Sequence, residues 1–430
     1  MLRLRTRLQE LEKDKNPIRV AVVGAGETDT GQKGATLVQQ IEGVQGMRVI
    51  AVADNCIEDA LEGLKKSEGN IEHTEDAYQA SSVIHEGKRI ITQNVHMVSE
   101  IPDVQVVVIA VKDANVAARC AFQCILQKKH LIMLNALADL TVGLFLKQMA
   151  DNAGVVYTFS IGDEPGITLE LCNFAWLLGL EVLAAGKGKN NPLQLSATPD
   201  ELRNAAQEKG VSAQVLTSFV DGTKTMLEMT VLANATGLIP DVRGMHGPKC
   251  SVDDLLSIFC LKEKGGILER EGVVDYVIGD VAPGVFAIVR TEQKSFLKEL
   301  HYLKMGEGPN YLLYRPYHLG TLETPVSIAR AFFDKESSIV PLKQPVAETI
   351  AVAKRDLKVG EIIDEIGGYA TYGLIEKKDI AERENYLPLG LAKGARLLSE
   401  VKKGEVISCS KVSLDHSQFL ITLRTLQERR

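Results

Sequence analysis

An apolar segment followed by a glycine-rich turn constrains the fold more than any other feature of the sequence. Residues 19–24 read Arg-Val-Ala-Val-Val-Gly, Gly26 follows, and residues 49–54 form a second apolar segment that ends in Asp54. A buried strand, a glycine turn, a helix and a second strand ending in an acid form the βαβ unit typical of dinucleotide-binding proteins. Gly24 would allow the tight turn. Gly26 would let the backbone approach a pyrophosphate at the helix N-terminus.

Two details of this unit bear on the cofactor. The third glycine of the usual pattern would fall at position 29, where Asp29 stands, and Gly31 comes two residues later. The Asp54 carboxylate would accept hydrogen bonds from a ribose 2′-hydroxyl and repel a 2′-phosphate, which favours NAD. Arg48 or Lys112 could compensate, so NADP stays open. The residues expected to face the cofactor are Gly24, Gly26, Glu27, Thr28, Asp54, Ala110, Asn135 and Ala136.

The composition is that of a folded, globular protein. The 430 residues are 45% apolar and 24% charged, enough for two or three domains. A net charge of −7 argues against nucleic acid or an anionic membrane as the main partner. No apolar run reaches the ~18–20 residues of a spanning helix, and residues 1–13 lack the apolar core of a secretory signal. Seven scattered cysteines without a Cys-x-x-Cys pair favour a reducing, cytoplasmic location.

Strand and helix patterns alternate over residues 1–160, which we expect to form a dinucleotide-binding domain. The near-continuous apolar segments are typical of parallel strands that are buried on both faces. The polar segment 62–103 would cover the edge of the sheet. The sequence therefore predicts an α/β fold with an N-terminal Rossmann-like parallel sheet. Its strands are expected at 18–23, 48–53, 104–111, 130–134 and 155–159.

The pattern changes twice after residue 160. Residues 161–345 mix helices, strands and polar glycine turns, which predicts a central α+β domain for catalysis and dimerisation. A helix over 324–333 would return to the nucleotide domain. Residues 346–430 contain two similar phrases, Leu357-Lys-Val-Gly-Glu-Ile-Ile and Val401-Lys-Lys-Gly-Glu-Val-Ile, which predict a small all-β domain. The phrases resemble the SAF or β-clip domain, although two β-turns could also be similar by chance.

Two polar clusters begin the central domain. Asp163 and Glu164 follow a predicted strand, at the end where ligands bind in such sheets. Adjacent carboxylates can bind a divalent cation such as Mg²⁺ or Mn²⁺, or they can simply cap the next helix. Residues 185–192 are expected to form a tight polar turn that presents Lys187 and Lys189, unless this is an ordinary surface loop.

Further polar side chains follow, each with a structural alternative. Lys224 and Glu228 are four residues apart and could form only a helical ion pair. His246 lies between glycines and is a candidate for acid–base chemistry, although loop histidines are more often structural. The candidate catalytic residues are Asp163, Glu164, Lys187, Lys189, Lys224, Glu228 and His246, with Asp163 and Glu164 as metal ligands. The candidate substrate-binding residues are Asn190, Asn191, Lys249, Arg315 and His318.

Taken together, these motifs resemble a known family. The chain is similar to homoserine dehydrogenase-like oxidoreductases with a C-terminal SAF domain. The similarity rests on the glycine turn, on residues 162–166, 186–192 and 221–225, and on the terminal β domain. That group includes 1-deoxy-D-xylulose 5-phosphate reductoisomerase-like enzymes of isoprenoid biosynthesis. The resemblance covers nearly the whole chain. It implies a nucleotide domain, a central catalytic and dimerisation domain, a C-terminal domain, and a homodimer or higher homo-oligomer.

The sequence and the resemblance lead to one main hypothesis and two alternatives. We expect an NAD(P)-dependent oxidoreductase that acts on a small polyhydroxylated or phosphorylated substrate. As a reductoisomerase, it would hold a divalent ion on Asp163 and Glu164, and Lys187 or Lys224 would donate a proton to the carbonyl oxygen. Lys189, Lys249 or Arg315 would hold a phosphate. The alternatives are a simple alcohol dehydrogenase that needs no metal, and a catalytically impaired NAD-binding regulatory protein.

Overall fold

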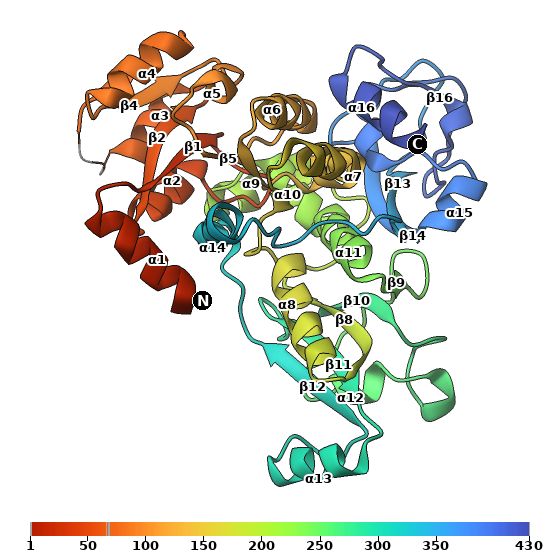
Figure 1. The fold of residues 1–430 in the computed structure, drawn as a ribbon. Helices are drawn as coiled ribbons and strands as arrows, with labels where there is room; N and C mark the ends of the chain where they lie inside the picture. The colour runs from red at the N-terminus through yellow and green to blue at the C-terminus, as the bar shows by residue number, and fades with distance from the viewer. Residues whose placement is uncertain (1, 66, 68, 430) are drawn as a thin grey trace. The chain divides into compact units, whose positions relative to one another are not determined.

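The computed structural model describes residues 2–65, 67 and 69–429, and its chain divides into two compact units (Figure 1). The first unit contains Met1–Gly162, Leu319–Val340 and His416–Arg430, and the second contains Asp163–His318 and Pro341–Asp415. Breaks after Gly162 and Val340 lie near the expected boundaries at 160 and 345. The structure groups residues 341–415 with the central part of the chain, however, and returns residues 416–430 to the first unit.

A seven-stranded parallel sheet forms the centre of the first unit, which confirms the predicted α/β fold class. The strand order β3-β4-β2-β1-β5-β6-β7 places β1 between the two halves, as in dinucleotide-binding folds. The segment 62–103 contributes β3 and β4 at one edge. The strands are β1 (Ile18–Val23), β2 (Met47–Ala53), β3 (Ile71–His73), β4 (Arg89–Thr92), β5 (Val106–Ile109), β6 (His130–Met133) and β7 (Tyr157–Phe159).

Helices cover this sheet and complete its core. Val20 and Val22 of β1 are fully buried in a cluster with Leu37 and Ile41 of α2 and with Ile328 of α14. The helix expected over 324–333 therefore does return to the nucleotide-type unit. The helices are α1 (Leu2–Lys13), α2 (Gly34–Glu42), α3 (Ile57–Leu64), α4 (Ala77–His85), α5 (Met97–Glu100), α6 (Ala114–Leu126), α7 (Ala136–Ala153), η2 (Gly320–Glu323), α14 (Thr324–Ala329), η3 (Arg330–Asp334) and α16 (Phe419–Glu428).

A mixed five-stranded sheet organises residues 163–318 of the second unit. In the order β12-β11-β8-β10-β9, β8 runs parallel to β10 and antiparallel to β11. The strands are β8 (Glu181–Lys189), β9 (Ile239–Pro240), β10 (Val273–Ile278), β11 (Val285–Arg290) and β12 (Asn310–Arg315). The helices are α8 (Glu164–Leu177), α9 (Pro199–Lys209), α10 (Ala213–Val220), α11 (Thr223–Thr236), α12 (Leu255–Ile258), η1 (Lys262–Lys264) and α13 (Lys294–Tyr302).

Residues 341–415 form the expected small antiparallel pairs, but they also contain the short helix α15 and are not entirely β. The two similar phrases pair with each other, since the N–H of Leu357 donates to the oxygen of Val401 at 2.8 Å and the reverse bond is 3.1 Å. That this part of the chain is a SAF domain stays a prediction. The elements are β13 (Ala347–Ala353), β14 (Thr371–Lys377), α15 (Lys378–Arg383), η4 (Leu389–Leu391), β15 (Arg396–Leu397), η5 (Cys409–Lys411) and β16 (Val412–Ser413).

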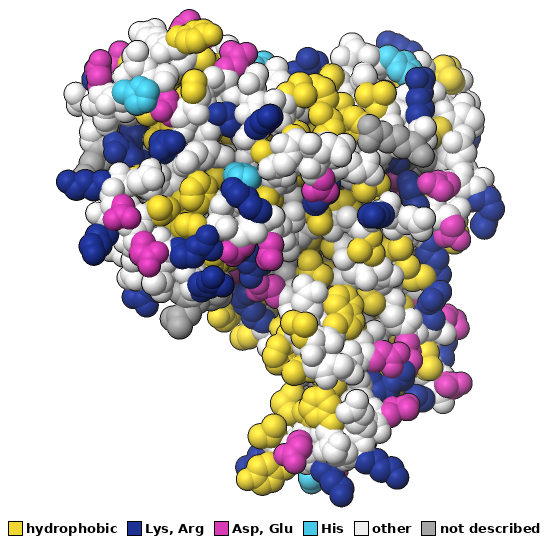
Figure 2. All heavy atoms as spheres, in the orientation of Figure 1, with side chains coloured by type: hydrophobic (Ala, Val, Ile, Leu, Met, Phe, Trp, Pro, Cys, Tyr) yellow, Lys and Arg dark blue, Asp and Glu magenta, His cyan; other side chains and the backbone are white. Residues whose placement is uncertain are grey.

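Two general properties follow from the described residues. Acidic and basic side chains are interspersed over the face shown in Figure 2, in keeping with the small net charge of −7. None of the helices in the described part of the chain is long and apolar enough to span a membrane.

Candidate functional site

The glycine turn after β1 is longer than the sequence pattern predicts. Helix α2 begins at Gly34, and residues 27–33 form a small hairpin closed by a bridge between Glu27 and Lys33. At its base the N–H of Gly34 donates to the oxygen of Gly26 at 2.7 Å, which brings the two glycines together. The usual spacing, which would place the third glycine at position 29, therefore does not apply to this turn. Gly34 takes that place after an insertion that a fixed motif spacing cannot detect.

Close backbone approach explains the glycines of this turn. Gly24 has a φ of +101°, and a Cβ there would lie 2.7 Å from the nitrogen of Val111. A Cβ on Gly34 would overlap the carbonyl oxygen of Gly24 and lie 2.8 Å from the Cα of Ala25. The turn thus has the compact, side-chain-free backbone that a dinucleotide pyrophosphate requires, so these residues fit the expected cofactor.

Asp54 fastens this turn. Its Oδ2 accepts the N–H groups of Ala25 at 2.6 Å and Gly26 at 3.0 Å, and its Oδ1 accepts that of Cys56 at 2.8 Å. A carboxylate oxygen can accept more than one hydrogen bond, so Oδ1 keeps capacity for a ribose hydroxyl. The expected contact of Asp54 with the cofactor is thus compatible with its role in the turn.

The other residues expected at the cofactor site have partners within the first unit. Glu27 pairs with Lys112 at 2.7 Å, and the buried Thr28 donates to the oxygen of Gln32 at 2.8 Å. Asn135 caps α7 by accepting the N–H of Ala138 at 2.8 Å. The remaining positions contribute backbone: Ala110 directly follows β5, and Ala136 opens α7 and donates its N–H to Asp29 Oδ2 at 3.3 Å.

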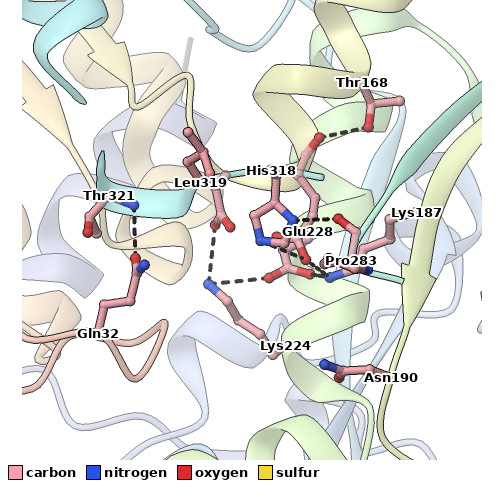
Figure 3. Close-up of polar contacts among 12 residues, drawn as sticks. Gln32, Thr168, Lys187, Asn190, Lys224, Glu228, Pro283, His318, Leu319 and Thr321 are labelled. Atoms are coloured by element: carbon pink, nitrogen blue, oxygen red, sulfur yellow. Dashed lines mark hydrogen bonds and ion pairs between the residues drawn. The ribbon is translucent and has the colours of Figure 1, made fainter. Parts of the chain in front are cut away.

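Five buried charged side chains gather in the second unit, and all five were predicted from the sequence. They are Asp163, Glu164, Lys187, Lys224 and Glu228, each less than a tenth exposed. Asp163 and Glu164 begin α8, Lys187 comes from β8, and the other two face the same place from the first turns of α11. Figure 3 shows Lys187, Lys224 and Glu228 pointing toward one another.

Ion pairs connect the members of this charged cluster. The Lys187 ammonium contacts both the Glu164 and the Glu228 carboxylates. The Lys224 ammonium lies 3.5 Å from Asp163 Oδ2 and 3.5 Å from Glu228 Oε1. Each of the three carboxylates therefore lies near a lysine, although two lysines offset only two of the three negative charges. In a buried region an unpaired charge would be costly.

A histidine completes a possible metal site beside these pairs. His318 places Nε2 3.6 Å from Glu164 Oε1, and its Nδ1 lies 2.8 Å from the carbonyl oxygen of Pro283. That carbonyl can only accept, which assigns the proton of a neutral imidazole to Nδ1 and leaves Nε2 free to coordinate. Ligand atoms of Asp163, Glu164 and His318 all lie within 4.8 Å of one another. His318 was predicted only as a substrate-binding residue.

The surroundings shift the pKa values of these ionisable groups in different directions. Burial raises the pKa of Asp163, and the Lys224 charge only partly opposes this. Burial and the charge of Glu228 also raise the pKa of Glu164, but Lys187 and the other neighbours outweigh them and lower it overall. Although burial opposes it, the two carboxylates raise the pKa of Lys187 well above its ordinary value. Lys187 is therefore a fixed positive charge and a poor proton donor.

The predicted polar turn at 185–192 is largely wrong, because residues 186–189 lie inside β8. The backbone of Asp275 lies so close to Gly186, and that of Ala282 so close to Gly188, that a Cβ at either glycine would overlap it. The strand keeps Lys187 and Lys189 on one face, two residues apart. Lys189 donates to the carbonyl oxygen of Phe219 at 2.5 Å, and burial together with the Lys187 charge lowers its pKa to about 8.

The remaining candidates have other partners. His246 Nε2 lies 2.9 Å from Asp241 Oδ2, and the Arg315 guanidinium lies 4.6 Å from the centre of the Tyr317 ring. Lys249 is bridged to Ile278 through its backbone. Asn190 and Asn191 follow β8, where Asn191 Nδ2 donates to Asn190 Oδ1 at 3.0 Å.

Sequence reasoning missed a lysine that supports this cluster. Lys354, at the end of β13, forms a fully buried ion pair with Asp221 at 2.7 Å and donates to the oxygens of Ala197 and Gly368. Asp221 in turn accepts the N–H of Thr223 at 2.8 Å, at the start of the helix that bears Lys224. The signal in the sequence was a lysine that directly follows the short apolar run 350–353.

Comparisons with known proteins agree with an enzyme of this type. Residues 162–324 match the model of a family described as oxidoreductase DRL, catalytic domain, a segment that contains the whole charged cluster. The prediction of an oxidoreductase is confirmed by this match. The comparison with curated protein sequences gave no match.

Several solved structures are similar in fold. A homoserine dehydrogenase from Thiobacillus denitrificans is 15% identical, with a TM-score of 0.45 over 84% of this chain and 92% of that chain. A probable dehydrogenase from Thermotoga maritima is 14% identical, with a TM-score of 0.42 over 75% and 91%. A DOX-P reductoisomerase in complex with magnesium is 13% identical, with a TM-score of 0.39 over 76% and 72%. Similarities this low do not define a substrate.

Proposed function

We propose that the protein is an NAD(P)-dependent oxidoreductase that acts on a CH–OH group of a small polyhydroxylated or phosphorylated substrate. The observation that carries this proposal is the charged cluster, in which three possible metal ligands lie beside two buried lysines. The glycine turn of the first unit supports the cofactor, because its backbone fits a dinucleotide. The cofactor would supply or accept the hydride.

The positions of the charges suggest different roles for the lysines toward a substrate carbonyl oxygen. Lys187 is held between Glu164 and Glu228, so it would stabilise negative charge that develops on oxygen without giving up its own proton. Lys224 has longer contacts to its carboxylates, 3.5 Å each, and is the better candidate to donate a proton to that oxygen. Lys189, with a pKa near 8, could hold a phosphate or exchange a proton near neutral pH.

A divalent ion fits the chemistry of Asp163, Glu164 and His318. Two carboxylates and one imidazole are suitable ligands for Mn²⁺, and the oxygens suit Mg²⁺. A bound ion would polarise a ketone and its neighbouring hydroxyl, as a reductoisomerase requires. The simple dehydrogenase remains the second candidate, because Lys187 already neutralises Glu164 without a metal.

Metal binding separates these two candidates. We expect Mn²⁺ alone to bind the purified protein in calorimetric titration, and Asp163→Asn and His318→Gln each to weaken binding about tenfold or more. His301→Gln is the control, because His301 lies in the same unit with a side chain 64% exposed. Equal binding by all variants would eliminate this metal site. Hydride transfer to sugar phosphates or hydroxy acids that is unaffected by EDTA would favour the simple dehydrogenase.

A further inference from the structure

At the expected adenosine end of the cofactor site, the backbone N–H groups that could bind a 2′-phosphate already donate hydrogen bonds to a carboxylate. Backbone N–H groups at turns and helix N-termini are common phosphate ligands in proteins. Here those of Ala25, Gly26 and Cys56 all donate to Asp54, at 2.6, 3.0 and 2.8 Å. A phosphate group could reach these donors only by displacing a carboxylate.

A second carboxylate lies at the same place. Asp59 stands in the first turn of α3, which directly follows Asp54 and Cys56. A Cβ placed on Gly26 would lie 3.1 Å from Asp59 Oδ2 and 3.8 Å from Asp54 Oδ2. Both carboxylates therefore border one small space beside the glycine. Gly26 has no side chain of its own to fill that space.

The two cations that the sequence suggested as possible offsets, Arg48 and Lys112, are engaged elsewhere. Arg48 lies near the start of β2, at the end opposite Asp54, and donates to the oxygen of Gly87 at 2.8 Å. Lys112 pairs with Glu27 at 2.7 Å. The expectation that Arg48 could compensate for Asp54 is thus wrong, and Lys112 would first have to leave Glu27.

We propose that Asp59 is a specificity residue that, together with Asp54, makes the protein select NAD over NADP. This inference rests on the proposed function, because it presumes that the glycine turn binds a dinucleotide. A 2′-phosphate beside two carboxylates would be repelled, whereas the 2′-hydroxyl of NAD can donate a hydrogen bond to either one. The roles of the two acids differ. Asp54 also fastens the turn, but Asp59 does not accept those three N–H groups.

Direct binding of the two nucleotides tests this role without an enzymatic assay. Calorimetric titration of the full chain with NAD and with NADP should give at least about 100-fold tighter binding of NAD at low salt. Asp59→Asn should tighten NADP binding about tenfold and change NAD binding less than about threefold. Asp54→Asn should weaken both nucleotides, because it loosens the turn.

A neighbouring acid provides the matched control. Glu58→Gln removes the same charge one residue away, and its carboxylate contacts the Cys56 thiol rather than the space beside Gly26. It should leave the NAD to NADP ratio within about twofold. Wild-type preference for NADP, an unchanged ratio in Asp59→Asn, or an equal shift in Glu58→Gln would overturn the role of Asp59. Failure of the wild type to bind either nucleotide would instead overturn the proposed function.

Discussion

The charged cluster of the second unit and the glycine turn of the first prepare for ligands in opposite ways. In the cluster, side chains from α8, β8 and α11 bring buried charges together, and each charge is stabilised by an opposite one. In the turn, backbone groups rather than side chains would contact the ligand. The Asp54 carboxylate accepts hydrogen bonds from two of the backbone N–H groups there. The cluster should therefore be sensitive to substitutions that remove a charge. The turn should be sensitive to substitutions that add a side chain where the backbone is closely packed.

Removal of Lys187 should produce the largest effect, because it leaves two buried carboxylates without their shared cation. We expect Lys187→Met to lower the free energy of unfolding by about 3–5 kcal/mol. Urea denaturation monitored by circular dichroism measures this change. If the variant does not fold, Lys187→Met combined with Glu228→Gln should recover part of the loss, since the excess of buried negative charge is then smaller by one.

An exposed ion pair provides the matched control for Lys187. Lys262 pairs with Glu269, and their side chains are 57% and 61% exposed. Lys262→Met should cost less than about 1 kcal/mol, because water already solvates both charges. A loss in Lys187→Met as small as the loss in Lys262→Met would show that charge balance does not hold the cluster together.

The sequence predicted the fold better than it predicted the environment of the site. Strands buried on both faces leave continuous apolar segments, so β1, β2, β5, β6 and β7 were all expected. Asp163 and Glu164 were found for a similar reason, because ligand-binding residues follow strand ends in such sheets. These inferences need only a few neighbouring residues in the sequence.

The errors arose where distant parts of the chain determine the structure. Glycine and lysine are uncommon in strands, so residues 186–189 were expected to form a turn, and only the neighbours Asp275 and Ala282 explain the small residues there. Gly34 was missed because the hairpin 27–33 interrupts the motif. The pair of Lys354 with Asp221 joins distant segments, and no local pattern could predict it.

The buried acid Asp139 should respond to pH in the sense opposite to Glu164 of the cluster. Burial raises the pKa of Asp139 from 3.8 to about 7, although Tyr157 donates a hydrogen bond to its Oδ1 at 2.7 Å. Between about pH 4 and 7 the folded protein holds a proton on Asp139 that the unfolded chain releases. Stability should therefore decrease as pH rises through this window, by up to about 4 kcal/mol, and level off above it.

Substitution of Asp139 isolates this contribution from the other titrating groups. Asp139→Asn keeps an oxygen that can accept from Tyr157 and removes the titration. The difference in unfolding free energy between wild type and variant should thus change steadily from pH 4.5 to 7. Two parallel profiles would contradict the raised pKa. Glu164 differs because Lys187 and its other neighbours together outweigh burial and lower its pKa, so its contribution has the opposite sign and is lost in acid.

The smallest expected effect concerns space in the glycine turn. Gly34→Ala places a methyl group against the Gly24 carbonyl oxygen and should push the start of α2 away from β1. We expect NAD binding to weaken at least about tenfold, which corresponds to about 1.4 kcal/mol. Gly43→Ala at the other end of α2 is the control. Gly43 has an ordinary φ of −74°, and its added Cβ would be 3.4 Å or more from its neighbours, so binding should change less than about twofold. Normal NAD binding by a folded Gly34→Ala variant would mean that the hairpin 27–33, and not the close approach of the glycines, determines cofactor affinity.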